Sequence, residues 1–147
     1  MYRKGISALI KNNKEEFLLV NLHSFEEKYF AIPGGGLDEG ETLEDAVYRE
    51  IKEELGIDKD KLKYIGESDE PLRFDFKVIK LSRDGKEYKG SEKYVFGFEF
   101  LGNEIIIPDN EVRAYKWVSL EDLDKYLLFD GQLDETVDKI NEIFKKK

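Results

Sequence analysis

A glycine-rich turn that runs directly into an acidic helix is the feature that most constrains this chain. Residues 34–36 are three consecutive glycines, and Thr42 and Asp45 have the spacing of a helix N-cap and its third residue. Apolar residues then recur at helical intervals, and Gly56 is the expected stop. The apolar positions are Leu43, Ala46, Val47, Ile51 and Leu55. The sequence therefore predicts a helix over residues 42–55 that is entered from a glycine-rich loop.

Three carboxylates of this helix fall close together. Glu50 precedes Glu53 and Glu54 by three and four residues, which predicts one acidic patch, expected opposite the apolar stripe. Like charges so placed repel, and oxygen ligands of this kind select Mg²⁺, Mn²⁺ or Ca²⁺. Arg49 lies one turn before Glu53 and can orient a carboxylate through a bidentate contact, with Glu41 of the loop as the other possible partner.

An acidic helix face that is simply solvated is the alternative to a metal site. The neighbouring glycines favour the metal site, because Gly34, Gly35 and Gly36 let backbone amides and carbonyls approach a metal or a phosphate closely. An ordinary flexible turn is the competing interpretation of these glycines.

The rest of the chain predicts an α+β fold. Two apolar runs flank an Asn-Asn-Lys turn, two further runs alternate apolar and polar residues around an Arg-Asp-Gly turn at 83–85, and a helical pattern closes the chain. Ser119 is expected to cap a short helix. Strands are predicted at 5–11, 16–21, 29–32, 72–78, 94–100 and 113–118, and a C-terminal helix through Leu133, Val137, Ile140 and Phe144.

Composition narrows the class of protein. A length of 147 residues with 40% apolar side chains predicts a single domain over residues 1–147. The net charge of −9 argues against binding to a DNA duplex, and the absence of cysteine excludes thiolate sites and suits the reducing cytoplasm. No apolar run approaches the roughly 20 residues that cross a bilayer, so no membrane partner is expected.

The segment at residues 35–57 resembles the signature of the Nudix hydrolase family. That signature is Gly, five residues, Glu, seven residues, then Arg-Glu-aliphatic-x-Glu-Glu-x-Gly-aliphatic. The matching residues, without departure, are Gly35, Glu41, Arg49, Glu50, Ile51, Glu53, Glu54, Gly56 and Ile57. The likeness extends to the FAIPGGG entry and the KWVSLEDL segment, and therefore spans most of the chain.

The resemblance implies a fold and an activity. The fold is a mixed β-sheet sandwiched between α-helices, and the activity is hydrolysis of a nucleoside diphosphate linked to another group, with Mg²⁺ or Mn²⁺ as cofactor. By position, the implied metal ligands are Glu50, Glu53, Glu54 and the Gly34 carbonyl. Arg49 and Glu41 would orient these ligands, and Gly35 and Gly36 would approach the substrate.

Four local likenesses concern the substrate. The segment around Phe74, the pair Lys93 and Tyr94, the residue Glu111, and Arg3 near the N-terminus resemble dinucleoside polyphosphate hydrolases and RNA 5′-pyrophosphohydrolases. They imply base stacking by Phe74 and Tyr94, phosphate contacts by Arg3 and Lys93, and a base or metal ligand in Glu111. The expected substrate is a small-molecule nucleotide such as diadenosine tetraphosphate, with the triphosphorylated 5′ end of RNA as runner-up.

Alternatives stay open for these assignments. Phe74 departs from the family's tyrosine and could be a core residue, Lys93 a surface lysine, Tyr94 a half-buried tyrosine and Glu111 a surface loop residue. Pro71 leaves an ADP-ribose pyrophosphatase as an alternative activity. A nucleoside triphosphate pyrophosphatase is a further alternative. A non-catalytic nucleotide sensor is the alternative from another class, because fold does not determine function.

Overall fold

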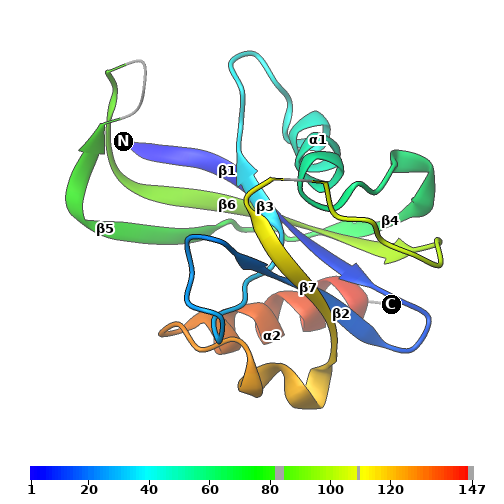
Figure 1. The fold of residues 1–147 in the computed structure, drawn as a ribbon. Coiled ribbons are helices and arrows are strands. Elements are labelled where there is room, and N and C mark those ends of the chain that lie inside the picture. Colours follow the sequence, from blue (N-terminus) through cyan, green and yellow to red (C-terminus); the bar gives the residue numbers. More distant parts are fainter. Residues whose placement is uncertain (82–84, 109, 146–147) are drawn as a thin grey trace.

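One mixed sheet forms the centre of the protein in a computed structural model, which describes residues 1–81, 85–108 and 110–145, without the side chains of 76–81. The sheet has seven strands in the order β4-β6-β1-β2-β7, with β3 paired to β1 and β5 paired to β6 (Figure 1). The strands are β1 Tyr2–Lys11, β2 Glu16–Leu22, β3 Gly34–Gly36, β4 Leu62–Glu67, β5 Leu72–Leu81, β6 Glu87–Phe100 and β7 Val112–Ser119. The helices are α1 Leu43–Leu55 and α2 Gln132–Phe144, with the short 3₁₀ helices η1 Lys59–Lys61 and η2 Leu120–Lys125.

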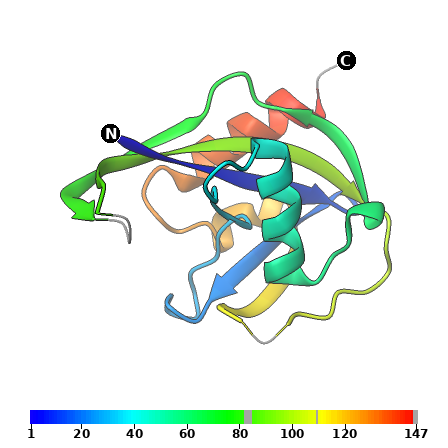
Figure 2. The ribbon, with the colours of Figure 1, turned by 90° about the horizontal axis from the view of Figure 1, so that it is seen from above.

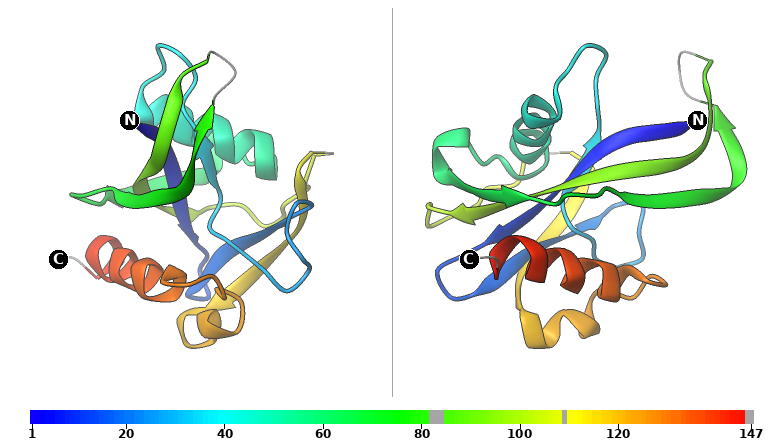
Figure 3. Two further views of the ribbon diagram at one scale, coloured as in Figure 1. Left: turned by 90° about the vertical axis from the view of Figure 1, so that its left-hand side faces the viewer. Right: turned by 180° about the vertical axis from the view of Figure 1, so that it is seen from behind.

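The two α-helices cover opposite faces of the sheet, as Figure 3 shows. Strand β1 alternates accordingly: Ile6, Ala8 and Ile10 belong to the core cluster beneath α1, whereas Leu9 belongs to the cluster beneath α2. This arrangement confirms the expected mixed sheet between helices and the α+β class.

Strands β1 and β6 form a long parallel pair at the middle of the sheet (Figure 2). The alternation in the sequence predicts one buried face for this strand, and in β6 the even-numbered Phe96 and Phe98 do pack under α1. The prediction of a single buried face is nevertheless wrong. The opposite face of β6 is also buried, because Val95 and Gly97 lie under α2; a Cβ on Gly97 would be 2.4 Å from the Ile143 methyl group. The strand is therefore apolar on both faces.

The predicted ends of α1 and the predicted first hairpin are confirmed. Thr42 caps α1 by accepting a hydrogen bond from the Asp45 amide at 3.1 Å, and Gly56 closes it in the left-handed conformation. Strands β1 and β2 pair antiparallel around the Asn12 turn. The C-terminal helix is α2, and the strands predicted at 72–78 and 113–118 are β5 and β7.

Two predictions of local structure are wrong. Residues 29–32 form no strand; Ala31 makes only an isolated bridge to Val20, and the strand that follows is β3, in the glycines themselves. Ser119 precedes η2 but its side chain makes no capping hydrogen bond, and η2 is a 3₁₀ helix. The Phe76 and Val78 side chains and the turn residues Arg83 and Asp84 lie outside the described residues.

No helix in the described part of the chain is long and apolar enough to cross a membrane.

Candidate active site

The glutamates of α1 do not all face solvent, which corrects the expectation of an acidic patch opposite the apolar stripe. Glu50 and Glu54 are buried, with 9% and 3% of their surface exposed, whereas the Glu53 side chain is 59% exposed. The reason is the helical period. Glu50 and Glu54 continue the four-residue ladder from Ala46, and Ala46 is fully buried under the helix. Two carboxylates therefore point inward, beside the sheet.

The glycine strand β3 makes room for these carboxylates. A Cβ on Gly35 would lie 2.4 Å from the carboxyl carbon of Glu50, closer than real Cβ atoms approach. The Gly34 amide donates a hydrogen bond to Glu54 Oε1 at 3.0 Å. Strand β3 pairs with Gly5–Ser7 of β1, which holds the glycine backbone against both side chains.

Arg49 links the loop to the helix. Its Nε and Nη2 donate to the two oxygens of Glu41 at 2.7 and 2.8 Å, and Nη2 also donates to the Gly36 carbonyl at 2.9 Å. Its Nη1 donates to Glu50 at 3.0 Å and to Glu53 at 3.2 Å. Both partners that the sequence offered for Arg49 are thus contacted at once, and the guanidinium orients three carboxylates.

The buried carboxylates repel one another electrostatically. Burial, reinforced by the charge of Glu50, raises the pKa of Glu54 to about 8, although the Gly34 amide opposes this. Burial likewise raises the pKa of Glu50, against the influence of Arg49. Glu41, in the loop before α1, behaves differently: the hydrogen bond from Arg49 lowers its pKa to about 2.

Two cationic side chains stand next to this cluster. The Arg3 guanidinium lies against Gly36, and the Lys93 ammonium lies against Gly5, its partner in the β1–β6 register. Burial, with the charge of Arg3, lowers the pKa of Lys93, while the buried glutamates oppose that shift. Lys93 is only partly exposed, so the alternative of a surface lysine does not fit the structure.

A cavity of about 170 Å³ adjoins Lys93 on the α2 side of the sheet. Phe74 on β5 lines it and is 40% exposed, which disfavours a core role for this ring. Glu135 also lines the cavity, and burial raises its pKa. The cavity has roughly the space of six water molecules, enough for one planar heterocycle.

Tyr94 is not brought to this cavity. Successive side chains of a strand point to opposite faces, so Tyr94 packs against the core cluster under α1 while its neighbour Lys93 lines the cavity. The geometry matches the alternative of a half-buried tyrosine.

Glu111 stands at the far end of α1, in the loop before β7. Its side chain is exposed, and its charge adds to the burial that raises the pKa values of Glu50 and Glu54. The His23 amide donates to the Glu111 carbonyl at 2.8 Å. The preceding residue, Asn110, contacts the backbone of α1, which no motif in the sequence indicated.

The donor set fits a divalent cation. All candidate ligands are oxygens, and two of them are buried carboxylates whose pKa values are raised mainly by burial, in spite of Arg49 beside Glu50 and Lys93 near Glu54. Within residues 1–81, 85–108 and 110–145, no three acidic or histidine side chains are arranged so that they could hold a metal ion as they stand. Glu50 is held by Arg49 against the glycine strand, and Glu54 is held by the Gly34 amide.

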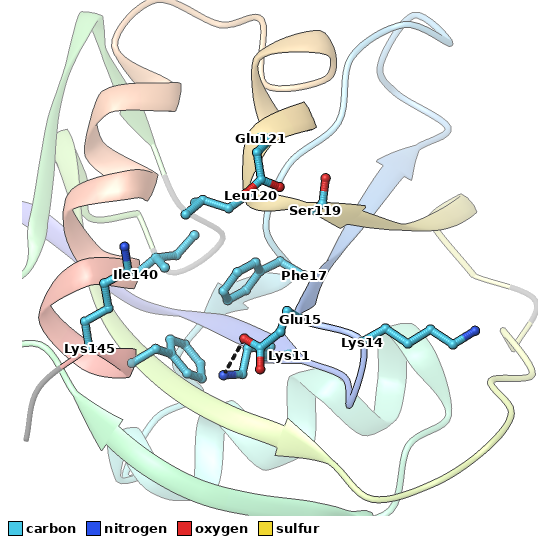
Figure 4. Close-up of a pocket in the computed structure, with 10 residues that line it drawn as sticks. Lys11, Lys14, Glu15, Phe17, Ser119, Leu120, Glu121, Ile140 and Lys145 are labelled. Atoms are coloured by element: carbon cyan, nitrogen blue, oxygen red, sulfur yellow. Dashed lines mark hydrogen bonds and ion pairs between the residues drawn. The ribbon is translucent and has the colours of Figure 1, made fainter.

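A second hollow lies elsewhere on the protein, where the β1–β2 hairpin meets the C-terminal end of α2 (Figure 4). Its volume is about 350 Å³, and its walls include Phe17 and Ile140. Lys11 pairs there with Glu15 at 3.2 Å, as the dashed line shows. None of the candidate site residues lines this hollow. The candidate metal ligands lie instead at α1 and β3.

Comparisons with known proteins agree with this geometry. A family model described as NUDIX domain matches residues 1–139. An RNA pyrophosphohydrolase of Bartonella bacilliformis is 33% identical over 136 residues, covering 82% of this chain and 79% of that protein. Two solved structures share the fold. The E. coli dihydroneopterin triphosphate pyrophosphohydrolase has a TM-score of 0.72 at 19% identity, covering 99% of both chains. A C. elegans Ap4A hydrolase binary complex has a TM-score of 0.62 at 23% identity, covering 90% of both chains.

Proposed function

Because the chain belongs to the Nudix family, we propose that it is a metal-dependent pyrophosphohydrolase that cleaves a phosphoanhydride bond in a nucleotide carrying three or more phosphates. The observation that carries this proposal is the pair of buried glutamates, Glu50 and Glu54, held against the glycine strand beside the cations Arg3 and Lys93. A divalent cation would neutralise the glutamates, and an anionic phosphate chain would neutralise Arg3 and Lys93.

We propose that Glu50, Glu53 and Glu54 hold the cation, with the Gly34 carbonyl beside them. Mg²⁺ is the preferred resident, with Mn²⁺ as the alternative, because both take oxygen ligands and bridge carboxylates to phosphates. When bound, the cation supplies charge neutralisation of the phosphates and acidification of a water molecule.

The chain's own residues would do the remaining work. Arg49 and Glu41 hold the carboxylates of α1 in place, and Arg3 and Lys93 bind phosphate oxygens. The Glu111 carboxylate accepts the proton of the attacking water, a role that its exposed position beside the buried glutamates permits.

The cavity beside Lys93 supports a nucleotide substrate. A base seated against Phe74 would place its phosphates toward Lys93 and the glutamates. Tyr94 is left out of this proposal.

We favour the triphosphorylated 5′ end of RNA and diadenosine tetraphosphate as substrates. The curated relative at 33% identity bears the name RNA pyrophosphohydrolase, and a solved Ap4A hydrolase has the same fold. The cytoplasm is the compartment that we propose, since RNA 5′ ends and nucleoside polyphosphates are present there.

A hydrolysis panel tests this proposal. Triphosphorylated RNA, diadenosine tetraphosphate, deoxynucleoside triphosphates and ADP-ribose would be compared by kcat/KM with Mg²⁺ and with Mn²⁺. Glu54→Gln and Lys93→Ala serve as variants. We expect the first two substrates to be preferred, Glu54→Gln to be nearly inactive, and Lys93→Ala to lose at least about tenfold in kcat/KM.

Other outcomes would overturn parts of the proposal. A best kcat/KM on ADP-ribose would replace the polyphosphate substrate, and full activity of Glu54→Gln would refute the ligand assignment. Binding of a ligand without turnover of any substrate would favour a nucleotide sensor.

A further inference from the structure

Glu111 occupies a position that needs an anchor. It is an exposed residue of the loop before β7, and its charge is one of the smaller causes that raise the pKa values of Glu50 and Glu54. Like charges repel, so this electrostatic interaction opposes the approach of the Glu111 loop to α1. A contact that ties the loop to the helix offsets this repulsion.

Asn110 makes that contact through its side-chain amide. Its Nδ2 donates to the carbonyls of Glu53 and Glu54 in the last turn of α1, the latter at 3.2 Å. The last carbonyls of a helix lack partners within the helix, and the Gly56 amide already satisfies Lys52 at 2.9 Å. Asn110 thus supplies a donor where the helix needs one.

The same side chain shapes the backbone on the other side of Glu111. Asn110 Oδ1 accepts a hydrogen bond from the Val112 amide at 2.7 Å, which spans Glu111 in a tight turn. The His23 amide adds a second tie, to the Glu111 carbonyl at 2.8 Å. The backbone of Glu111 is therefore held from both flanks.

We infer that Asn110 is a positioning residue, which holds Glu111 beside Glu50 and Glu54 by tying its loop to the C-terminal end of α1; this inference rests on the role proposed for Glu111. Asparagine suits the task because its amide is both donor and acceptor and carries no charge. An aspartate of the same shape would present a second acceptor, and a negative charge, to the negative end of the helix.

Two substitutions separate the donor from the acceptor of this side chain. Asn110→Ala removes all three hydrogen bonds, whereas Asn110→Asp keeps an acceptor for the Val112 amide but loses the donor to the two carbonyls of α1. Asn12→Ala is the matched control, because Asn12 Oδ1 accepts hydrogen bonds from the Lys14 and Glu16 amides in the β1–β2 turn, away from the site. Each variant would be made in the wild-type chain and in a Glu111→Gln chain.

We expect Asn110→Ala and Asn110→Asp each to lower kcat about tenfold with less than about a threefold change in KM. In the Glu111→Gln chain, either substitution should change kcat less than about twofold, because its target is already removed. In the metal-free protein, hydrogen exchange at the Val112 amide should quicken in Asn110→Ala and stay slow in Asn110→Asp. Asn12→Ala should leave kcat and this exchange unchanged.

Three results would overturn the inference. Wild-type kcat in Asn110→Asp would show that the donor to α1 is not needed. An equal loss of kcat in the Glu111→Gln chain would show that Asn110 acts independently of Glu111. A wild-type rate in Glu111→Gln alone would remove the role of Glu111, and the inference with it, while leaving the hydrolase assignment to the Glu54→Gln test.

Discussion

Among single residues, Glu54 couples the chemistry of the site to the stability of the fold. Its pKa is raised from 4.5 to about 8 in the folded protein, mainly by burial. Between those two values the folded chain keeps a proton that the unfolded chain has lost. Stability from this group is therefore complete below about pH 4.5 and is lost as the pH rises through 8.

We predict that the metal-free protein becomes less stable between about pH 5 and pH 8, by up to about 1.4 kcal/mol per pH unit from Glu54. Glu54→Gln should remove most of this dependence and be as stable as wild type or more so at pH 8. Urea unfolding in the presence of a chelator measures the effect, with Glu44→Gln on the exposed side of α1 as control. Identical pH slopes in wild type and Glu54→Gln would contradict the prediction.

At Arg49, the planar guanidinium group is needed and not only the positive charge. A lysine keeps the charge, but it cannot hold both oxygens of Glu41 and the Gly36 carbonyl from one planar group. We predict that Arg49→Lys lowers kcat by about 10 to 100-fold and weakens metal binding. Steady-state kinetics and a Mn²⁺ titration measure these quantities. Arg73→Lys, at an exposed arginine that pairs with the half-buried Glu92 away from α1, is the control and should change kcat less than about twofold. A wild-type rate in Arg49→Lys would mean that charge alone suffices.

At the level of secondary structure, the site depends on the close approach of β3 and α1. A methyl group on Gly35 would overlap the Glu50 carboxyl group, so either the side chain must turn away or β3 must separate from β1. A larger residue at this place therefore cannot be accommodated while the Glu50 carboxyl group, β3 and α1 all keep their positions.

We predict that Gly35→Ala costs about 1 to 3 kcal/mol of unfolding free energy and most of the activity. Gly66→Ala in β4 is the control, because a Cβ there would meet only the Ile143 methyl group at an ordinary 3.7 Å. Urea unfolding and the hydrolysis assay would be run on both variants. An active, stable Gly35→Ala protein would show that the Glu50 carboxyl group need not lie where the structure has it.

For the whole molecule, the net charge of −9 limits how it can bind a polyanion. Long RNA is repelled by the surface at large, whereas Arg3 and Lys93 offer a local cationic site beside β3. Binding of an RNA 5′ end should therefore depend on the first nucleotides and little on the rest of the strand.

We predict that kcat/KM for triphosphorylated RNA changes less than about threefold between about two and about twenty nucleotides, and falls only modestly between about 50 and 200 mM salt. Lys93→Ala should lower it to the same extent at every length. A rise of more than about tenfold with length would point to an extended RNA-binding surface that the charge distribution does not suggest.

The features of this protein that depend on neighbours along the chain could be predicted from its amino-acid sequence. The cap at Thr42, the stop at Gly56 and the β1–β2 hairpin were all predictable, because their causes act within a few residues. The spacing of the glycines and glutamates from Gly35 to Ile57 was enough to indicate the family. The roles of those residues in catalysis stay predictions until they are tested.

The contacts between distant segments, and the depth to which side chains between them are buried, became evident from the fold. The spacing from Ala46 gives Glu50 and Glu54 an inward direction, but how deeply they are buried depends on how closely the sheet packs under α1. The separation of Lys93 from Tyr94 depends on which helix covers each face of β6. The Asn110 contact joins residues more than fifty positions apart. Such contacts arise from packing between distant segments, whose positions local spacing and propensity do not specify.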